Sequence, residues 1–191
     1  MATTELRIAG FGGQGVILAG IVIGKAAAIY DGKHATLTQS FGPEARGSAC
    51  SAQLVLSDQP ILYPYLTALD ILVAMSQDAY HRFGSELQPE GLLLVEAELV
   101  TCHPRPDGPP GIRLHGIPAT RLAEELGRRA VSNIVMVGFL TAMTGLVSVE
   151  AIKQAIADSV PRGTEAVNLA AFEKGLEYGL AHLPTQPALQ V

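Results

Sequence analysis

The first residues whose types and spacing could do chemistry form a glycine-rich turn near the N-terminus. Glycine permits left-handed backbone and the close approach of another group. The free N–H groups at the start of a helix favour an anion. The turn can therefore hold an anion or a partner's backbone, or its glycines can serve helix–sheet packing alone. Its residues, in a G-x-G-x-x-G pattern, are Gly10, Gly12, Gly13, Gln14 and Gly15.

The residues after this turn disfavour a nicotinamide dinucleotide site. Such a site needs an acidic residue at the end of the second strand, where it binds the ribose hydroxyls. Here the strand ends in Thr38, Gln39 and Ser40, and Asp31 falls in the turn before it. A stand-alone nucleotide-binding domain therefore remains an alternative, although the acidic residue it requires is missing.

A loop that holds one acid and one arginine is the second candidate site. The planar guanidinium of Arg46 suits a carboxylate or a phosphate. The alternative is an exposed local pair of Glu44 with Arg46, worth about 0–1 kcal/mol. On the residues alone the local pair is the favoured interpretation. The candidate residues of the loop are Ser40, Gly42, Pro43, Glu44, Arg46 and Gly47.

Short apolar segments that read as strands alternate with helical ones, which predicts an α/β fold: three-layer, Rossmann-like, with a mostly parallel (mixed) sheet flanked by helices. The first strand, the helix over residues 14–30 and the second strand predict a βαβ unit with a right-handed crossover. The expected strands are residues 6–9, 34–38, 48–56, 70–75, 92–95 and 112–115.

Punctuation residues mark where the later helices begin and end. Pro118 and Gly127 bracket one helix, as proline favours helix starts and glycine helix ends. A further helix is expected from Thr164 to about His182, and Pro184 stops it. The other candidate caps are Ser76, Ser132 and Ser148 at helix starts and Gly145 at a helix end.

The composition limits the classes of function. Of 191 residues 48% are hydrophobic, only 16% are charged, and the net charge is −5. The negative charge argues against nucleic-acid binding. The few charges indicate buried parallel strands and a surface that contacts partner subunits. The N-terminus does not resemble a signal peptide, and the apolar stretch Val16–Gly24 is too short to span a membrane. We expect a cytoplasmic protein with one domain over residues 1–183 and a flexible tail over 184–191.

The remaining polar residues predict structural roles and no metal site. Cys50 and Cys102 are too few for an iron–sulfur cluster, which needs about four cysteine ligands. The five histidines lack metal-ligand spacing. Asn133 and Asn168 fall in the first turns of helices, where asparagine bonds to nearby backbone.

Several segments together resemble the gamma subunit of 2-oxoacid:ferredoxin oxidoreductases, which is equivalent to domain III of pyruvate:ferredoxin oxidoreductase. The resemblance covers residues from about Leu6 to Gly179, and the order and spacing of its segments are more specific than any one of them. Ser48 departs from the pattern, where many relatives carry a second glycine. The matching residues are Gly12–Gly15, Ser40–Gly47, Ser57–Asp58, Tyr63–Pro64, Ser76–Gln77, Asn133, Gly138, Asn168, Phe172 and Gly175.

The resemblance implies a complex that oxidatively decarboxylates a 2-oxoacid to an acyl-CoA and reduces ferredoxin. Thiamine diphosphate with Mg, the iron–sulfur clusters and CoA would then be bound in the complex, and none of them by this chain alone. The partners would be the thiamine-binding and iron–sulfur subunits. The loop with Glu44 and Arg46 would lie at a subunit interface or near the substrate. A subunit of an indolepyruvate-type oxidoreductase is an alternative, and among oxoacids 2-oxoglutarate is mildly favoured.

Overall fold

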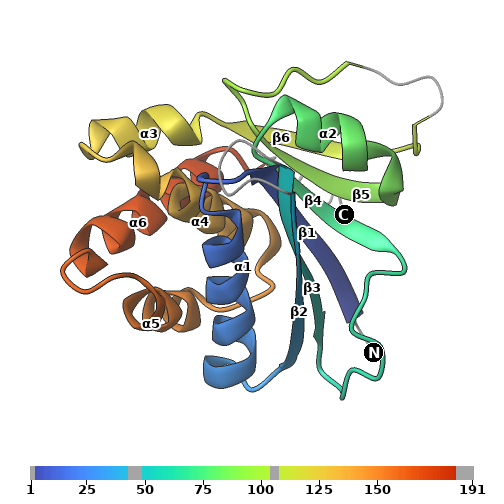
Figure 1. Ribbon diagram of the computed structural model, residues 1–191, viewed down its shortest axis with the longest axis horizontal. Coiled ribbons are helices and arrows are strands. Elements are labelled where there is room, and N and C mark those ends of the chain that lie inside the picture. The colour runs from blue at the N-terminus through green and yellow to red at the C-terminus, as the bar shows by residue number, and fades with distance from the viewer. Residues whose placement is uncertain (1–2, 43–48, 104–107, 184–191) are drawn as a thin grey trace, which may run out of the picture.

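A six-stranded sheet organises the chain, in the order β2-β3-β1-β4-β5-β6 (Figure 1). The structure is a computed structural model and describes residues 3–42, 49–103 and 108–183. β3 runs antiparallel to both of its neighbours, whereas β4, β5 and β6 continue parallel to β1. The expected mostly parallel, mixed sheet is confirmed. The strands are β1 (Thr3–Phe11), β2 (His34–Phe41), β3 (Ala49–Ser57), β4 (Leu69–Ala74), β5 (Leu87–Glu96) and β6 (Arg113–Ile117).

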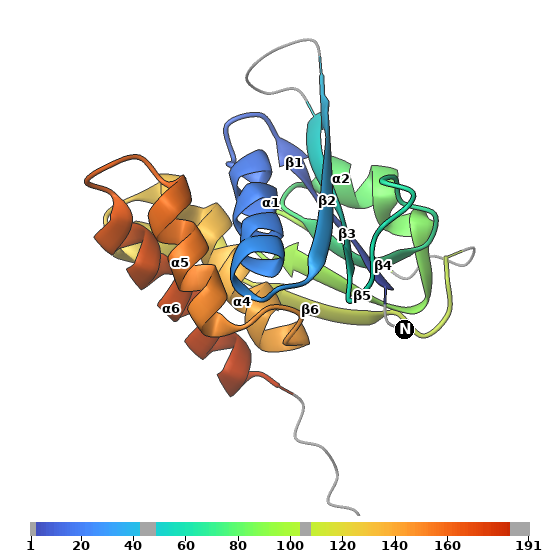
Figure 2. The same ribbon diagram turned by 90° about the horizontal axis from the view of Figure 1, so that it is seen from below.

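Helices cover both faces of the sheet, as the expected three-layer fold requires. Figure 2 shows α1, α4, α5 and α6 on one side of the strands and α2 on the other. Among the described residues, no helix has the length and apolar character needed to cross a membrane. The helices are α1 (Val16–Lys25), which continues as a π-helical turn over Ala26–Tyr30, α2 (Gln77–Phe83), α3 (Ala119–Glu125), α4 (Ser132–Thr144), α5 (Val149–Ser159) and α6 (Glu165–Ala181).

The central strands are buried on both faces, and their side chains alternate between two cores. Ile71 and Val73 of β4 point into the larger core beneath α1 and α4. Leu72 and Ala74 point into the smaller core beneath α2. This is why the strand is an unbroken apolar run in the sequence.

The first crossover differs from a simple βαβ unit. β2 runs in the same direction as β1, but β3 lies between them and pairs antiparallel with both. The length and apolar pattern of the strands do not predict that β3 lies between β1 and β2, because strand order depends on long-range pairing in the folded sheet. The right-handed sense of the crossover stays a prediction.

Most of the predicted helix caps are observed, with one correction. The hydroxyls of Ser76 and Ser148 each accept a hydrogen bond from the backbone N–H three residues on, at 3.2 Å. Gly145 ends α4 in a left-handed conformation, with φ 59°. The prediction for Ser132 is wrong: a 3₁₀ turn over Arg129–Val131 precedes it, so Ser132 is already helical, and no side chain caps the start of α4.

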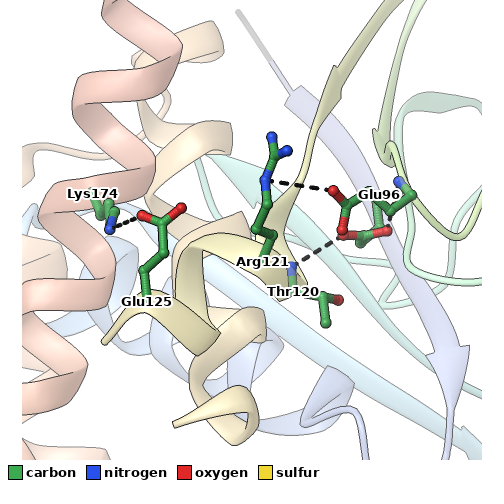
Figure 3. A network of polar contacts seen from close by, with 6 residues as sticks. Glu96, Thr120, Arg121, Glu125 and Lys174 are labelled. Atoms are coloured by element: carbon green, nitrogen blue, oxygen red, sulfur yellow. Dashed lines mark hydrogen bonds and ion pairs between the residues drawn. The ribbon is translucent and has the colours of Figure 1, made fainter. Parts of the chain in front are cut away.

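Buried Glu96 ties the end of β5 to the start of α3 (Figure 3). Its carboxylate accepts hydrogen bonds from the backbone N–H of Thr120 at 3.0 Å and of Glu98 at 2.9 Å. An exposed ion pair of Arg121 with Glu98, at 3.5 Å, lies beside this anchor. The N–H of Thr120 lies in the first turn of α3, so the anchor satisfies one of the N–H groups that a helix start otherwise leaves without partners.

The crossing of α4 and α6 is unusually close because glycines face the opposite helix. A Cβ atom at Gly138 would lie 2.1 Å from the carbonyl oxygen of Phe172. A Cβ atom at Gly175 would lie 1.9 Å from the carbonyl oxygen of Val135. In the first turn of α6, Asn168 donates from Nδ2 to the Thr164 carbonyl at 2.8 Å.

Candidate functional site

The glycine-rich turn connects the end of β1 to the start of α1. Its backbone closes with a hydrogen bond from the Gln14 N–H to the Phe11 carbonyl, at 3.1 Å. Gly13 and Gly15 have φ of 100° and 71°, a region that favours glycine. No side chain caps the start of α1, where Gly15 is the N-cap residue. The expected strand–turn–helix context is present.

The side chain of Gln14 fixes the turn against the neighbouring strand. Its Oε1 atom accepts from the backbone N–H of Phe11 at 2.7 Å. Its Nε2 atom donates to the carbonyl of Met75, just after β4, at 2.8 Å. The Met75 N–H in turn donates to the Ala9 carbonyl at 2.8 Å. The ends of β1 and β4 are therefore tied together through one amide side chain.

Asn133, in the first turn of α4, holds the other end of the turn. Its side chain is buried, and Nδ2 donates to the Gly15 carbonyl at 3.0 Å. A Cβ atom at Gly15 would lie only 2.4 Å from that nitrogen. Two sequence-predicted residues far apart in the chain thus meet at one point, while Asn168 lies in a different helix and takes no part in this contact.

A cavity of about 540 Å³ opens between the turn, the first residues of α1 and the ends of β2 and β3. The β2–β3 ladder closes next to it, where the Gly42 N–H donates to the Ala49 carbonyl at 2.9 Å. Apart from glycine, its walls are mostly apolar, so it suits an apolar group or a packed chain better than a bare anion. It is lined by Gly12, Gly13, Gly15, Val16, Ile17, Leu18, Phe41, Gly42, Ala49 and Cys50.

The second predicted segment is described only up to Gly42, which lines the same cavity. Gly42 and Ala49, which both line the cavity, flank the loop in the sequence. Ser40 lies in β2, is exposed, and stands opposite Ser51 of β3. The candidate residues Pro43, Glu44, Arg46 and Gly47 lie outside the described residues.

Cys50 lines the cavity, although the sequence pattern does not indicate it as part of a site. Partial burial raises the pKa of its thiol above the ordinary value. Phe41, 65% exposed, was also not singled out. Phe41 and Cys50 lie opposite one another in the β2–β3 pairing. Their position beside the turn could be predicted only if that register were known.

The two cysteines do not fit a shared iron–sulfur cluster. Cys50 lines the cavity on the α1 side of the sheet, whereas Cys102 packs against the core beneath α2. Among residues 3–42, 49–103 and 108–183, no three or more His, Cys, Asp or Glu side chains gather in a way that could hold a metal ion.

Comparison with known proteins identifies the family. The family model described as pyruvate ferredoxin/flavodoxin oxidoreductase matches residues 5–178. Subunit KorC of 2-oxoglutarate synthase is 49% identical over 174 residues in Methanocaldococcus jannaschii, covering 91% of this chain and 92% of that protein. The same subunit from Methanothermobacter thermautotrophicus is 52% identical over 176 residues, covering 91% and 93%.

A solved structure agrees with the fold and the relatives. The gamma subunit of keto/oxoacid ferredoxin oxidoreductase from Geobacter sulfurreducens superposes with a TM-score of 0.81 at 39% identity, covering 93% of this chain and 99% of that one. The resemblance to gamma subunits found in the sequence is confirmed. The chain therefore belongs to the pyruvate ferredoxin/flavodoxin oxidoreductase family.

Proposed function

We propose that this chain is the gamma subunit of a cytoplasmic 2-oxoglutarate:ferredoxin oxidoreductase. The complex would decarboxylate the oxoacid, form an acyl-CoA and pass electrons to ferredoxin. The observation that carries this proposal is the identity of 49% and 52% with two subunits named for 2-oxoglutarate synthase, over more than nine-tenths of each chain. Pyruvate and indolepyruvate enzymes are the competing members of this reaction class.

Within that complex we propose a structural and interface role, with the cofactors bound by partner subunits. The chain has only two cysteines, and these lie on opposite sides of the sheet. The cavity beside the glycine turn has the apolar walls and rigid backbone of a docking site. Gln14 and Asn133 keep that backbone in one arrangement, which lowers the entropy cost of contact with a partner.

We further propose that the loop containing Glu44 and Arg46 lies near the substrate or a subunit interface. Arg46 would pair with a carboxylate or a phosphate through its planar fork. A 2-oxoacid, the phosphates of CoA and a partner's acidic side chain all offer such groups. The position of Gly42 and Ala49 at the cavity supports a common role for the loop and the glycine turn.

The test is an anaerobic assay of the complex purified with its partner subunits. A panel of 2-oxoglutarate, pyruvate, branched-chain oxoacids and indolepyruvate would be compared by kcat/KM with CoA and ferredoxin. We expect 2-oxoglutarate to be preferred by at least about tenfold, since one or two specific contacts discriminate substrates to that extent. A preference for pyruvate or indolepyruvate would overturn the substrate assignment and leave the family assignment intact.

A variant tests the proposed loop in the same assay. Arg46→Ala should lower the activity of the assembled complex while the isolated subunit keeps its unfolding midpoint. Arg46→Lys, which keeps the charge but not the fork, should restore only part of the activity. A fully active Arg46→Ala complex would contradict the role. Titration of the isolated chain with nicotinamide and adenine nucleotides tests the stand-alone alternative, and tight binding would favour it.

A further inference from the structure

β2 is an edge strand whose outer hydrogen-bonding groups face away from the sheet (Figure 2). The hydrogen bond from Gly42 N–H to the Ala49 carbonyl sets the alternation in the β2–β3 ladder. In an antiparallel pair, every second residue bonds to the neighbouring strand and the residues between them point outward. The N–H and C=O groups of Ala35, Leu37, Gln39 and Phe41 therefore point outward.

This edge lacks the features that normally prevent strands from pairing. From Ala35 to Phe41 the sequence contains neither a charge nor a proline. Exposed edges are usually shielded by lysines, prolines or short length. The opposite edge, β6, shows the contrast: it is five residues long, begins with Arg113 and is followed by Pro118. Of the two edges of the described sheet, β2 is the long and uncharged one that can serve as a template for another strand.

We infer that the β2 edge pairs with the β2 edge of a second copy of this chain, antiparallel and centred on Thr38. In this register Ala35 faces Phe41 of the second copy, and Leu37 faces its Gln39. Each outward-facing residue then donates one backbone hydrogen bond and accepts one. The pairing has two-fold symmetry, the commonest symmetry of protein dimers. It goes beyond the proposed function and does not depend on which oxoacid is used.

The side chains of the edge complement themselves in this register. On the side away from α1, Thr36 faces Ser40 of the second copy and Thr38 faces its own equivalent. The Thr36 hydroxyl donates to the Pro64 carbonyl at 3.3 Å within its own chain and can still accept from Ser40. Cross-strand pairs of threonine and serine stabilise antiparallel sheets.

The α1 side of the edge favours the same occupant. Phe41 is 65% exposed, and the register places its ring against the small side chain of Ala35 in the other copy. A charged edge would repel itself across a two-fold axis, but no charge stands in this segment. The uncharged segment and the fit of the exposed Phe41 ring against a small side chain favour a second copy as the occupant.

Sedimentation of the isolated full chain at increasing concentration is the first test. The mass should rise from 20.0 kDa towards twice that value. Gln39→Pro removes an outward N–H that β3 does not use, so it should weaken dimerisation roughly tenfold or more while the fold survives. Gln39→Ala keeps the N–H and is the matched control. A chain that stays monomeric up to millimolar concentration overturns the inference.

Exchanging charges at the symmetry axis tests the register. Thr38→Lys and Thr38→Glu should each be monomeric alone, because like charges meet across the axis. An equimolar mixture of the two variants should form a mixed dimer. Circular dichroism checks that each variant is folded. A dimer that persists in Thr38→Lys and in Gln39→Pro uses another surface and overturns the inference.

Cross-linking extends the test to the assembled complex. Thr38→Cys should form a disulfide between two copies under mild oxidation, because the Cα atoms of a non-hydrogen-bonded pair lie about 4.5 Å apart, within the range that a disulfide spans. Thr36→Cys on the same face should not, because it faces Ser40 of the second copy. The double variant Thr36→Cys, Ser40→Cys should cross-link again. Equal cross-linking of Thr36→Cys and Thr38→Cys, or none in either, overturns the register.

Discussion

The side-chain nitrogen of Asn133 occupies the space that a side chain on Gly15 would need. The two residues are 118 positions apart, and they meet through a 3.0 Å hydrogen bond to the Gly15 carbonyl. Gly15 has φ 71°, so its backbone and its surroundings both require glycine. The contact makes the geometry of the turn depend on the position of α4.

Gly15→Ala should therefore destabilise the chain by more than the cost of placing alanine in a left-handed backbone conformation. We expect a loss of about 2 kcal/mol or more in the free energy of unfolding, measured by urea titration. Gly32→Ala is the matched control, with φ 65° and nothing within 4 Å of its Cβ position. It should lose only about 1 kcal/mol.

A second substitution separates the two contributions to that loss. Removing the amide with Asn133→Ala should cost about 1 kcal/mol, because the half-buried Gly15 carbonyl loses one of its two donors and keeps the Ala19 N–H at 3.0 Å. In the double variant Gly15→Ala, Asn133→Ala most of the steric part is relieved, because only the Cβ of residue 133, at 3.2 Å, stays near the new side chain. The total should therefore be smaller than the sum of the single losses. Strict additivity would show that the Asn133 contact does not restrict Gly15.

The glycines at the crossing of α4 and α6 predict a larger effect. Gly175→Ala should lose about 3 kcal/mol or more, because its Cβ would meet the Val135 backbone at 1.9 Å and the helices must separate. Gly24→Ala, in α1, meets its nearest atom at 3.4 Å and should be neutral or gain up to about 1 kcal/mol. Thermal or urea unfolding of both variants measures the difference. Similar stabilities would mean that the helices do not need close contact.

Removal of the Glu96 carboxylate should weaken the join between β5 and α3. Glu96→Ala leaves two backbone N–H groups without their acceptor and should cost about 2–3 kcal/mol. Glu98→Ala removes only an exposed ion pair with Arg121 and should cost about 0–1 kcal/mol. Hydrogen exchange at Thr120 should speed up in the first variant and not in the second. If the exchange rate of the Thr120 amide is unchanged in Glu96→Ala, the Glu96 carboxylate does not anchor α3.

The thiol of Cys50 should react slowly, and its rate of reaction should rise at a higher pH than that of a free cysteine. Burial raises its pKa, so a smaller fraction is thiolate at pH 8 than in a free cysteine. In a Cys102→Ser background, iodoacetamide should modify the folded chain more slowly than the urea-unfolded chain at that pH. The rate should keep rising with pH after the rate of the unfolded chain levels off. Equal profiles in the two states would contradict the shift.

The sequence predicts the local elements better than the contacts between them. The apolar run of β4 and the serine caps of α2 and α5 depend on neighbouring residues, and these predictions are confirmed. The place of β3 between β1 and β2 depends on which strands meet in the folded sheet, so the pattern does not specify it.

The candidate site shows the same division. The glycine pattern indicates the turn itself, because the residue types and the flanking segments are local. Its contacts with Met75 and Asn133 join distant positions, and Phe41 and Cys50 reach the cavity only through the register of β2 with β3. Such long-range pairs leave no signal in the spacing of a single sequence.

The insertion of β3 has a consequence for how the chain folds. β1 emerges first during synthesis, but both strands that flank it come later: β3 starts at Ala49 and β4 at Leu69. β2 and β3 are close in the chain and can form a hairpin early, because short loops close at little entropic cost. β1 then stays unpaired, with its apolar faces exposed, until the hairpin pairs with it on one side and β4 on the other. The nascent chain is therefore most prone to aggregate before β4 has left the ribosome.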